Sequence, residues 1–340
     1  MNLSLLRKAR GQRLALRSAW FVVCVLCLSV AAGCKGKPPS EEQRTILRLN
    51  GSRVMGMELA PLLAGAFLMK KGGTGVTRVT GPQGEIIVRA FLPGLQAQQA
   101  IEIRATDSDG AFEALRQGFS DVGMSTRPVT RRERDAIAKI GLGDVGSPSN
   151  EHRIGVDSIA IIVSHRNRVI SLTREQVSHI FSGAITDWSQ VNAAMGGKIT
   201  IYLGDEQKAS YQSITEIVGE YGAPGPKLSP HTLRFADERE LSDSVARDPQ
   251  GIGAVKIPYI GSANSVAVVG KDGMSYHPNL INVRAGNYPL SRPLFLYTPS
   301  TPEGSLSSEF VAFCLSPEGQ DLIQKAGFIR AADLGHPRQP

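Results

Sequence analysis

The stretch YLGDEQKASYQSITEIV, residues 202–218, has the pattern of a turn that leads into a helix. Backbone N–H groups in the first turn of a helix have no partner within the helix, and the helix dipole adds partial positive charge there, so anions bind well at such a place. Lys208 and Ser210 would attract an anion, whereas Asp205 and Glu206 would repel it. No arginine is present for a bidentate contact, so the location suits an anion better than its residues do.

Three other polar turns follow expected strands and are candidate site loops. They are Gly51-Ser52-Arg53, Asp107-Ser108-Asp109-Gly110 and Ser125-Thr126-Arg127. The sequence has no His-Glu-x-x-His motif, no P-loop, no G-x-S-x-G motif and no carboxylate pair at a convincing spacing. Its six histidines are scattered. We therefore expect a binding protein and not an enzyme, with no metal site and no cofactor.

The segments that would position these turns alternate between strand and helix. The pattern predicts a strand over residues 44–52 that ends at a Gly-Ser turn, and a helix over 57–73 with glycine at its end. The same order repeats over 98–118 and over 121–140, where Thr130 and Glu133 predict a capping box. Repeated strand, turn and helix indicate an α/β fold with mainly parallel sheets, in which ligands bind at the carboxyl ends of the strands.

The N-terminal 33 residues have the layout of a secretory signal. Five Lys and Arg residues precede an apolar run of about 13 residues, 20–32, which is too short to span a bilayer comfortably. Ala31-Ala32-Gly33 before Cys34 resembles a bacterial lipobox, which implies cleavage before Cys34 and a lipid on that cysteine. An ordinary signal peptide and an uncleaved anchor are the alternatives. The lipobox places the protein on the periplasmic or cell-surface face of a membrane, and Lys35 favours the outer membrane if the organism is Gram-negative.

Charge and cysteine usage exclude further classes for the mature chain. Removing the signal, with its five basic and no acidic residues, lowers the net charge from +7 to +2. No basic run with interleaved aromatic residues remains, so we expect no nucleic-acid binding. Cys24 and Cys27 lie in the removed segment, so their spacing indicates neither redox nor metal chemistry. Cys314 lies in an apolar pattern and is expected to be a buried structural thiol.

The middle and the end of the chain resemble the PstS-like solute receptors that bind phosphate. GVDSIAIIVSHRNRVISLTREQVSHIFSGAITDWSQV, residues 155–191, resembles their strand DGIAVIV, which is followed by a helix ending in IFSG and then by I-x-x-W. DPQGIGAVKIPYI (248–260), YPLSRPLFLYT (288–298) and FCLSPEGQDLIQKAGF (313–328) resemble later motifs of the same family. The resemblance runs through most of residues 45–330 in the same order, which several separate motifs would rarely do by chance.

The resemblance implies a type II periplasmic binding protein fold. This is an α/β fold with two lobes of mixed, mainly parallel sheets around a central cleft, joined by crossing strands. The N-terminal residues predict a signal peptide at 1–33 and a Pro-rich, polar tether at 34–44. The resemblance then implies lobe I at 45–160 with 285–335, and lobe II at 161–284. Its implied function is that of a monomeric, lipid-anchored receptor, which passes phosphate or a related small oxyanion to the permease of an ABC transporter.

The same resemblance locates a departure from the family in the turn at 204–210. Phosphate receptors carry an Arg-x-x-x-Ser-Gly-Thr turn that supplies the charge partner of the anion. Aligned on the shared Tyr211, the arginine position is Gly204, the first serine is Lys208 and the glycine is Ala209. Only the hydroxyl position remains, as Ser210. Charge-assisted hydrogen bonds contribute about 1.5–3 kcal/mol each, so we expect a weakened site or a different ligand, with Lys208 as a point charge that does not reproduce the arginine geometry.

The remaining turns supply the other predicted ligand-binding residues. The full predicted set is Ser52, Arg53, Ser108, Thr126, Arg127, Asp157, Lys208 and Ser210. Structural alternatives stay open for several of them. Arg53 would otherwise be solvated, the Ser108-Asp109 pair would form a helix N-cap, and Arg127 would form a salt bridge. Asp157 opens the strand that leads between the lobes and would otherwise be a structural hydrogen-bonding group.

Two functions therefore remain open. One is a receptor for phosphate or a related oxyanion that serves an ABC transporter. The other is a divergent protein with the receptor fold and another ligand or none, which acts in sensing or envelope assembly. Hydroxyl groups that converge with inward-pointing cations would favour the first function. Asp109, Asp205 and Glu206 lining the cleft without partners would disfavour phosphate.

Overall fold

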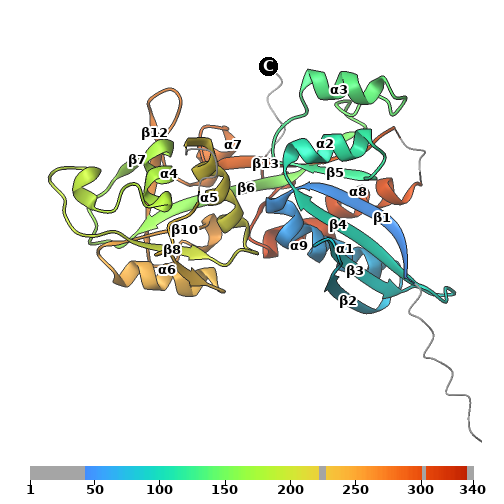
Figure 1. The fold of residues 1–340 in the computed structure, drawn as a ribbon, viewed down its shortest axis with the longest axis horizontal. Helices are drawn as coiled ribbons and strands as arrows, with labels where there is room; N and C mark the ends of the chain where they lie inside the picture. The colour runs from blue at the N-terminus through green and yellow to red at the C-terminus, as the bar shows by residue number, and fades with distance from the viewer. Residues whose placement is uncertain (1–42, 222–226, 301–303, 335–340) are drawn as a thin grey trace, which may run out of the picture. The chain divides into compact units, whose positions relative to one another are not determined.

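The computed structural model describes residues 43–221, 227–300 and 304–334, and its described residues from Gln43 onward form one compact unit (Figure 1). The predicted signal peptide, Cys34 and all but the last two residues of the predicted tether lie outside the described residues. Over the described ranges, no helix is both long enough and apolar enough to cross a bilayer.

The first lobe is built around three parallel strands. β1 (Gln43–Ser52) lies between β4 (Gln98–Thr106) and β5 (Val122–Ser125), and β2 (Thr74–Thr80) and β3 (Ile86–Phe91) extend the sheet antiparallel beyond β4. Its helices are the π-helix η1 (Met55–Leu59), α1 (Ala60–Lys70), α2 (Ser108–Arg116) and α3 (Arg131–Ala138). Because β1, β4 and β5 are parallel, the turns that follow them start at one edge of the sheet, as the sequence predicted.

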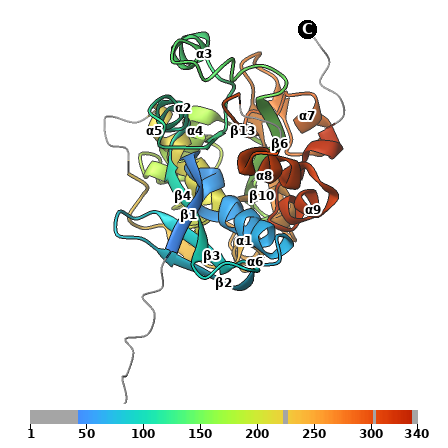
Figure 2. The ribbon, with the colours of Figure 1, turned by 90° about the vertical axis from the view of Figure 1, so that its right-hand side faces the viewer.

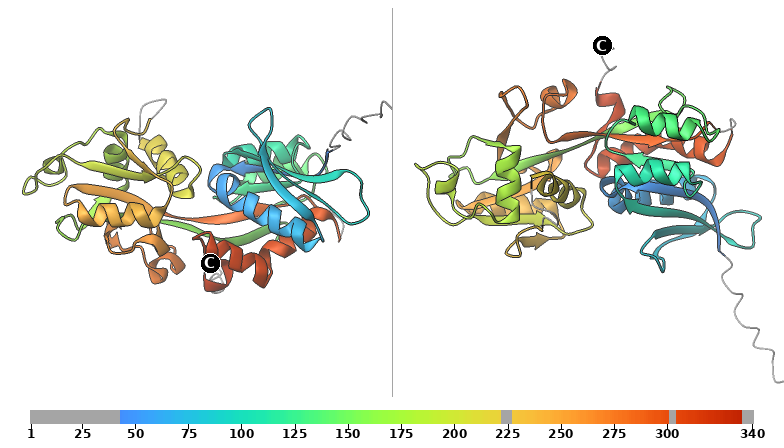
Figure 3. Two further views of the ribbon diagram at one scale, coloured as in Figure 1. Left: turned by 90° about the horizontal axis from the view of Figure 1, so that it is seen from below. Right: turned by 45° about the horizontal axis from the view of Figure 1, so that its top comes forward.

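Two long strands connect the lobes. The part of β6 (Glu151–Val163) from Glu151 to Ser158 pairs with β13 (Ser291–Tyr297), with a shift of register that skips Ile154, and β13 also pairs with β5. From Ile159 onward β6 pairs instead with β10 (Gly251–Lys256) of the second lobe. Figure 3 shows the two strands, green and orange, running from one group of elements to the other. The sheet thus changes partners between Ser158 and Ile159, and the exact lobe boundaries given above stay a prediction.

The second lobe repeats the arrangement of parallel strands followed by helices. β8 (Thr200–Gly204) lies between β10 and β9 (Leu233–Phe235), and all three are parallel. β7 (Ser171–Thr173), β11 (Asn264–Val269) and β12 (Ser275–Tyr276) form its other strands. The helical segments are α4 (Arg174–Ser182), η2 (Trp188–Gln190), α5 (Ala209–Tyr221), α6 (Glu238–Arg247), η3 (Ile257–Tyr259) and α7 (Leu280–Arg284). α5 therefore begins just beyond the carboxyl end of a parallel strand.

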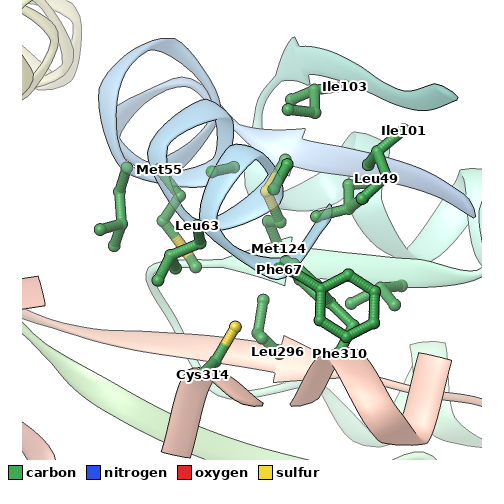
Figure 4. Packing of buried hydrophobic residues seen from close by; sticks show 14 of the residues in the cluster. Leu49, Met55, Leu63, Phe67, Ile101, Ile103, Met124, Leu296, Phe310 and Cys314 are labelled. Atoms are coloured by element: carbon green, nitrogen blue, oxygen red, sulfur yellow. The ribbon is translucent and has the colours of Figure 1, made fainter. Parts of the chain in front are cut away.

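The core of the first lobe also draws on the end of the chain. α8 (Leu306–Leu315) and α9 (Pro317–Lys325) lie beside α1 (Figure 2), and they lead to β14 (Ile329–Arg330) and η4 (Ala331–Leu334). The rings of Phe67 and Phe310 meet edge to face with their centroids 5.4 Å apart. Cys314 is buried in this cluster, as predicted (Figure 4). Burial raises the pKa of its thiol, so the cysteine is a packing residue rather than a nucleophile.

Candidate functional site

The turn after β1 carries a buried hydroxyl group with no partner. Gly51 pairs with Met124 on β5 and has a φ of 131°. A Cβ at this position would lie 2.1 Å from the carbonyl oxygen of Met124, so only glycine fits here. Ser52 follows, paired with Thr106 on β4, and its side chain is 1% exposed. Among the described residues, nothing hydrogen-bonds the Ser52 Oγ. The close strand packing at Gly51 thus holds a hydroxyl donor at the carboxyl edge of the sheet.

The turns after β4 and β5 are joined through their hydroxyl groups. The Oγ of Ser108 lies 3.3 Å from the Oγ1 of Thr126 and accepts a hydrogen bond from the Thr126 N–H at 3.1 Å. Asp107 is the N-cap of α2 and accepts from the N–H of Gly110 at 2.6 Å, so the N-cap alternative for Ser108 and Asp109 was wrong by one residue. Ser108 is therefore the first helical residue, with its hydroxyl beside that of Thr126.

The two predicted arginines of this lobe differ in their contacts. Arg53 is exposed, with no hydrogen bond or ion pair to any residue that the structure describes. Arg127 donates to both carboxylate oxygens of Glu133, at 2.9 and 2.6 Å, and it also pairs with Asp109. Its guanidinium lies 5.1 Å from the centre of the Phe112 ring. The bonds to Glu133, followed by those to Asp109, raise the pKa of Arg127, and these contacts match the salt-bridge alternative.

Asp157 lies in a buried network between β6, β13 and α5. Its side chain is 1% exposed, and its Oδ2 accepts from the Oγ of Ser213 at 2.7 Å and from Arg292 at 3.3 Å. Arg292 also bonds Ser213 and pairs with Glu216. These contacts match the structural alternative for Asp157, but its buried Oδ1 has no hydrogen-bond partner among the described residues, so the ligand-binding role of Asp157 stays a prediction. Arg292 and Ser213 were not singled out from the sequence, although Arg292 lies within the motif YPLSRPLFLYT.

Lys208 covers the position that the family's arginine would occupy. A Cβ added to Gly204 would lie 3.0 Å from the Cγ of Lys208 and 3.2 Å from the Oγ of Ser210. The stem of the lysine therefore packs over the backbone at Gly204. In the described parts of the chain, no residue hydrogen-bonds or pairs with the Lys208 ammonium. It remains available as a cation at the turn.

The hydroxyl group of Ser210 is already bonded inside the protein. Ser210 is fully buried, and its Oγ donates to the carboxylate of Glu238, the first residue of α6. The other oxygen of Glu238 accepts from the backbone N–H of Lys256 at 3.2 Å. Burial raises the pKa of Glu238, and the nearby Lys256 charge offsets only part of this rise. A ligand that bonded Ser210 would have to compete with Glu238.

A groove of about 700 Å³ opens beside this turn. Its lining residues are Met57, Glu58, Arg78, Asp205, Glu206, Gln207, Lys208, Arg234 and Ala236. The groove brings Lys208 together with two arginines, but none of the predicted hydroxyl donors is among these lining residues. Asp205 and Glu206 form no ion pair with any described residue. The predicted set thus falls into a hydroxyl cluster at Ser52, Ser108 and Thr126 and a charged turn at 204–210, and the described residues hold no cluster that fits a metal ion.

Comparison with known proteins shows which proteins this chain is similar to. A family model described as the PBP superfamily domain matches residues 73–318. The phosphate-binding protein PstS of Staphylococcus saprophyticus is 28% identical over 228 residues, which cover 65% of this chain and 68% of that protein. PstS of Pseudomonas aeruginosa is 28% identical over 242 residues, which cover 67% of this chain and 73% of that protein. These matches confirm the predicted PstS-like resemblance.

Solved structures agree with the fold class. A possible phosphate binding protein from Planctomyces limnophilus has a TM-score of 0.67 at 18% identity, covering 85% of this chain and 93% of that one. An ABC-type phosphate transport receptor from Vibrio cholerae has a TM-score of 0.53 at 21% identity, covering 83% of this chain and 99% of that one. At such identities the likeness concerns the fold alone, and it confirms the predicted two-lobed α/β architecture.

Proposed function

Because this chain belongs to the PBP superfamily, we propose that it is an extracytoplasmic solute-binding protein that takes phosphate or a related small oxyanion for an ABC transporter. The observation that carries the proposal is the buried Ser52 hydroxyl with no partner among the described residues. An unsatisfied buried polar group costs about 1–3 kcal/mol. An oxygen atom of a bound anion would accept this hydrogen bond and remove that cost.

Neighbouring groups add to the support. The hydroxyl groups of Ser108 and Thr126 lie together at the same sheet edge, and the N–H groups of Ser108 and Asp109 begin α2, where intrahelical partners are lacking. Lys208 supplies a cation on the second lobe. Relatives whose names state phosphate binding share about two thirds of the chain. An anion held between the hydroxyl cluster and the turn at 204–210 would receive hydrogen bonds from the first and positive charge from the second.

The second candidate is a receptor-fold protein with another ligand or none, acting in sensing or envelope assembly. It is favoured by Asp205 and Glu206, which line the groove without ion-pair partners among the described residues. Asp109, by contrast, is neutralised by Arg127 and does not argue against an anion. Only two of the three carboxylates that would disfavour phosphate are therefore unpaired.

Cys34 is proposed as the lipid attachment point, which would hold a monomeric receptor on the periplasmic or cell-surface face of a bacterial membrane, where it would serve the transporter permease. The support is the lipobox-like sequence before Cys34. Metabolic labelling with a fatty acid should mark the wild-type protein and leave Cys34→Ala unlabelled. Equal labelling of both proteins would contradict the proposal that Cys34 carries the lipid.

Calorimetric titration of phosphate tests the proposed ligand. We would use residues 35–340, unfolded and refolded to remove any carried ligand, with sulfate as a comparison. We expect saturable phosphate binding in the micromolar range, about −8 kcal/mol. Lys208→Ala should weaken it about tenfold or more because a charge-assisted contact is lost. Lys271→Ala, a change at an exposed lysine on another turn, is the matched control and should leave binding unchanged.

Two results would contradict this proposal. Absence of heat and of a thermal shift at millimolar phosphate would show that the receptor fold serves another ligand or another task. Equal weakening by Lys208→Ala and Lys271→Ala would show that the lysine acts only through net charge and not through a contact at the turn.

A further inference from the structure

The carboxylate of Glu58 sits at the start of α5. Glu58 lies on η1, six positions after Ser52 in the sequence, and its Oε2 accepts a hydrogen bond from the N–H of Ala209 at 3.2 Å. Ala209 is the first residue of α5, and it is fully buried in the hydrophobic cluster of the first lobe. An N–H at a helix start is a favourable place for an anion. Here a side chain of the protein itself supplies that anion.

The same carboxylate oxygen holds a buried cation. The Nζ of Lys256 is 2.6 Å from the Oε2 of Glu58 and 2.6 Å from the carbonyl oxygen of Ala326. The Lys256 side chain is 1% exposed, and its ammonium lies 4.2 Å from the centre of the Phe328 ring. A buried ammonium needs an anionic partner, because water cannot solvate it. Glu58 therefore already makes the two contacts that an incoming anion would make at this position, one to a helix N–H group and one to a cation.

The neighbouring residues fit the same interpretation. The alignment places Ala209 at the glycine of the family's anion-binding turn, and the arginine of that turn is replaced by Gly204. The remaining hydroxyl, that of Ser210, donates to Glu238. The contacts that an external anion would make with this turn are thus made by carboxylates of the chain. Glu58 reaches it from the first lobe, whereas Glu238 belongs to the second.

We propose that Glu58 is an internal ligand of the α5 turn, so that a free oxyanion binds there only by displacing its carboxylate and taking over Lys256 and the Ala209 N–H. This inference rests on the proposed function and makes Glu58 the residue that sets the affinity for the external ligand. A dianion has an advantage over the single charge of a carboxylate in this exchange, since attraction to Lys256 grows with charge. The expected ligand class is accordingly a dianionic oxyanion such as hydrogen phosphate.

Removing the charge of Glu58 tests the proposal. Glu58→Gln keeps the size of the side chain, leaves Lys256 without its anion and ends the competition, so phosphate should bind about tenfold to a hundredfold more tightly by calorimetry. Glu175→Gln is the matched control because it makes the same change of net charge at an exposed carboxylate on α4 that is not among the lining residues of the groove. We expect the control to change the dissociation constant by no more than about threefold, which is the effect of a screened surface charge.

A second variant covers the case in which Glu58→Gln does not fold, as judged by a thermal melt. Glu58→Asp keeps the charge but shortens the side chain by one methylene group, which withdraws the carboxylate from Ala209. We expect it to tighten phosphate binding by less than a complete loss of the charge would. It separates loss of contact from loss of charge.

The outcomes separate this inference from the proposed function. Tighter binding by Glu58→Gln than by both wild type and Glu175→Gln supports the internal ligand. Binding by Glu58→Gln alone also supports it, and would show that the wild-type turn is closed to phosphate, against the proposed function. Wild-type binding that Glu58→Gln leaves equal or weaker overturns the inference and leaves the proposed function standing. No binding by any of the proteins overturns both.

Discussion

Ser52→Ala should show two effects of the buried hydroxyl separately: the stability that it costs the free protein and the affinity that it adds for a bound anion. The Ser52 side chain is 1% exposed and its hydroxyl has no partner in the described structure. Removing an unsatisfied buried hydroxyl relieves a penalty of about 1–3 kcal/mol, while the loss of one oxygen atom leaves little empty space. We therefore expect the free energy of unfolding without ligand to stay constant or to rise by about 1 kcal/mol. Phosphate affinity should fall by about 1.5–3 kcal/mol, or about tenfold to 150-fold, because the anion loses a donor.

The matched control is Ser120→Ala in the same lobe. Ser120 is also buried, but its Oγ donates to the carbonyl oxygen of Val122 at 2.8 Å. We expect this variant to lose about 1 kcal/mol of stability and to bind phosphate like the wild type. Urea unfolding gives the first quantity and calorimetry the second. The reasoning fails if Ser52→Ala loses as much stability as Ser120→Ala and binds phosphate normally, since the hydroxyl would then be satisfied within the free protein.

Two further changes test the charged groups around the site. Arg127→Ala should cost about 1–2 kcal/mol in urea unfolding, because the partly buried bidentate pair with Glu133 is lost. It should weaken phosphate binding only about twofold to fivefold, because Asp109 loses the cation that neutralises it. Arg131→Ala on the exposed face of α3 should cost under about 0.5 kcal/mol, and a loss of affinity of about a hundredfold in Arg127→Ala would instead place that arginine in the site. Burial raises the pKa of Glu238, so its carboxyl group binds a proton more tightly in the folded protein than in the unfolded one. The resulting contribution to stability is complete below about pH 4.5 and is lost as the pH rises through the folded pKa. Glu238→Gln should flatten this fall in urea unfolding as the pH rises from about 4.5, whereas the exposed Glu240→Gln should follow the wild type. A Glu238→Gln curve that also follows the wild type would exclude Glu238 as the titrating group.

Features that depend on neighbouring residues were predictable from the sequence. The strand expected over 44–52 is β1, and the capping box of Thr130 and Glu133 is present, because periodicity and caps are local signals. The helix expected from residue 57 instead begins at Met55 with the π-helical segment η1, which periodicity does not distinguish from an α-helix. The common edge of the three site turns followed from the rule for parallel strands.

Contacts between distant segments could not be predicted in the same way. Glu58 was interpreted only as part of a helix, and its partner Lys256 lies 198 positions further along the chain. Arg127 remained open between two roles, because Glu133 fits the capping box without revealing that it also binds the arginine. Ser213 on α5 joins Asp157 only once β6 and α5 are packed together. Side-chain pairing across a fold depends on how whole helices and strands pack together. A single sequence contains no local pattern that reveals this packing.

The turn at 204–210 shows why the missing arginine is not an isolated substitution. A Cβ at Gly204 would lie 3.0 Å from the Cγ of Lys208, so an arginine at 204 requires the stem of Lys208 to move. Glycine at 204 therefore leaves the stem of Lys208 in its present place, and any side chain there would shift that stem by a few tenths of an ångström. The N–H of Ala209 and the hydroxyl of Ser210 are already bonded by carboxylates. The turn thus differs from the family pattern as a unit, in its cation, its backbone donor and its hydroxyl, and affinity at this turn depends on all three together and not on the arginine position alone.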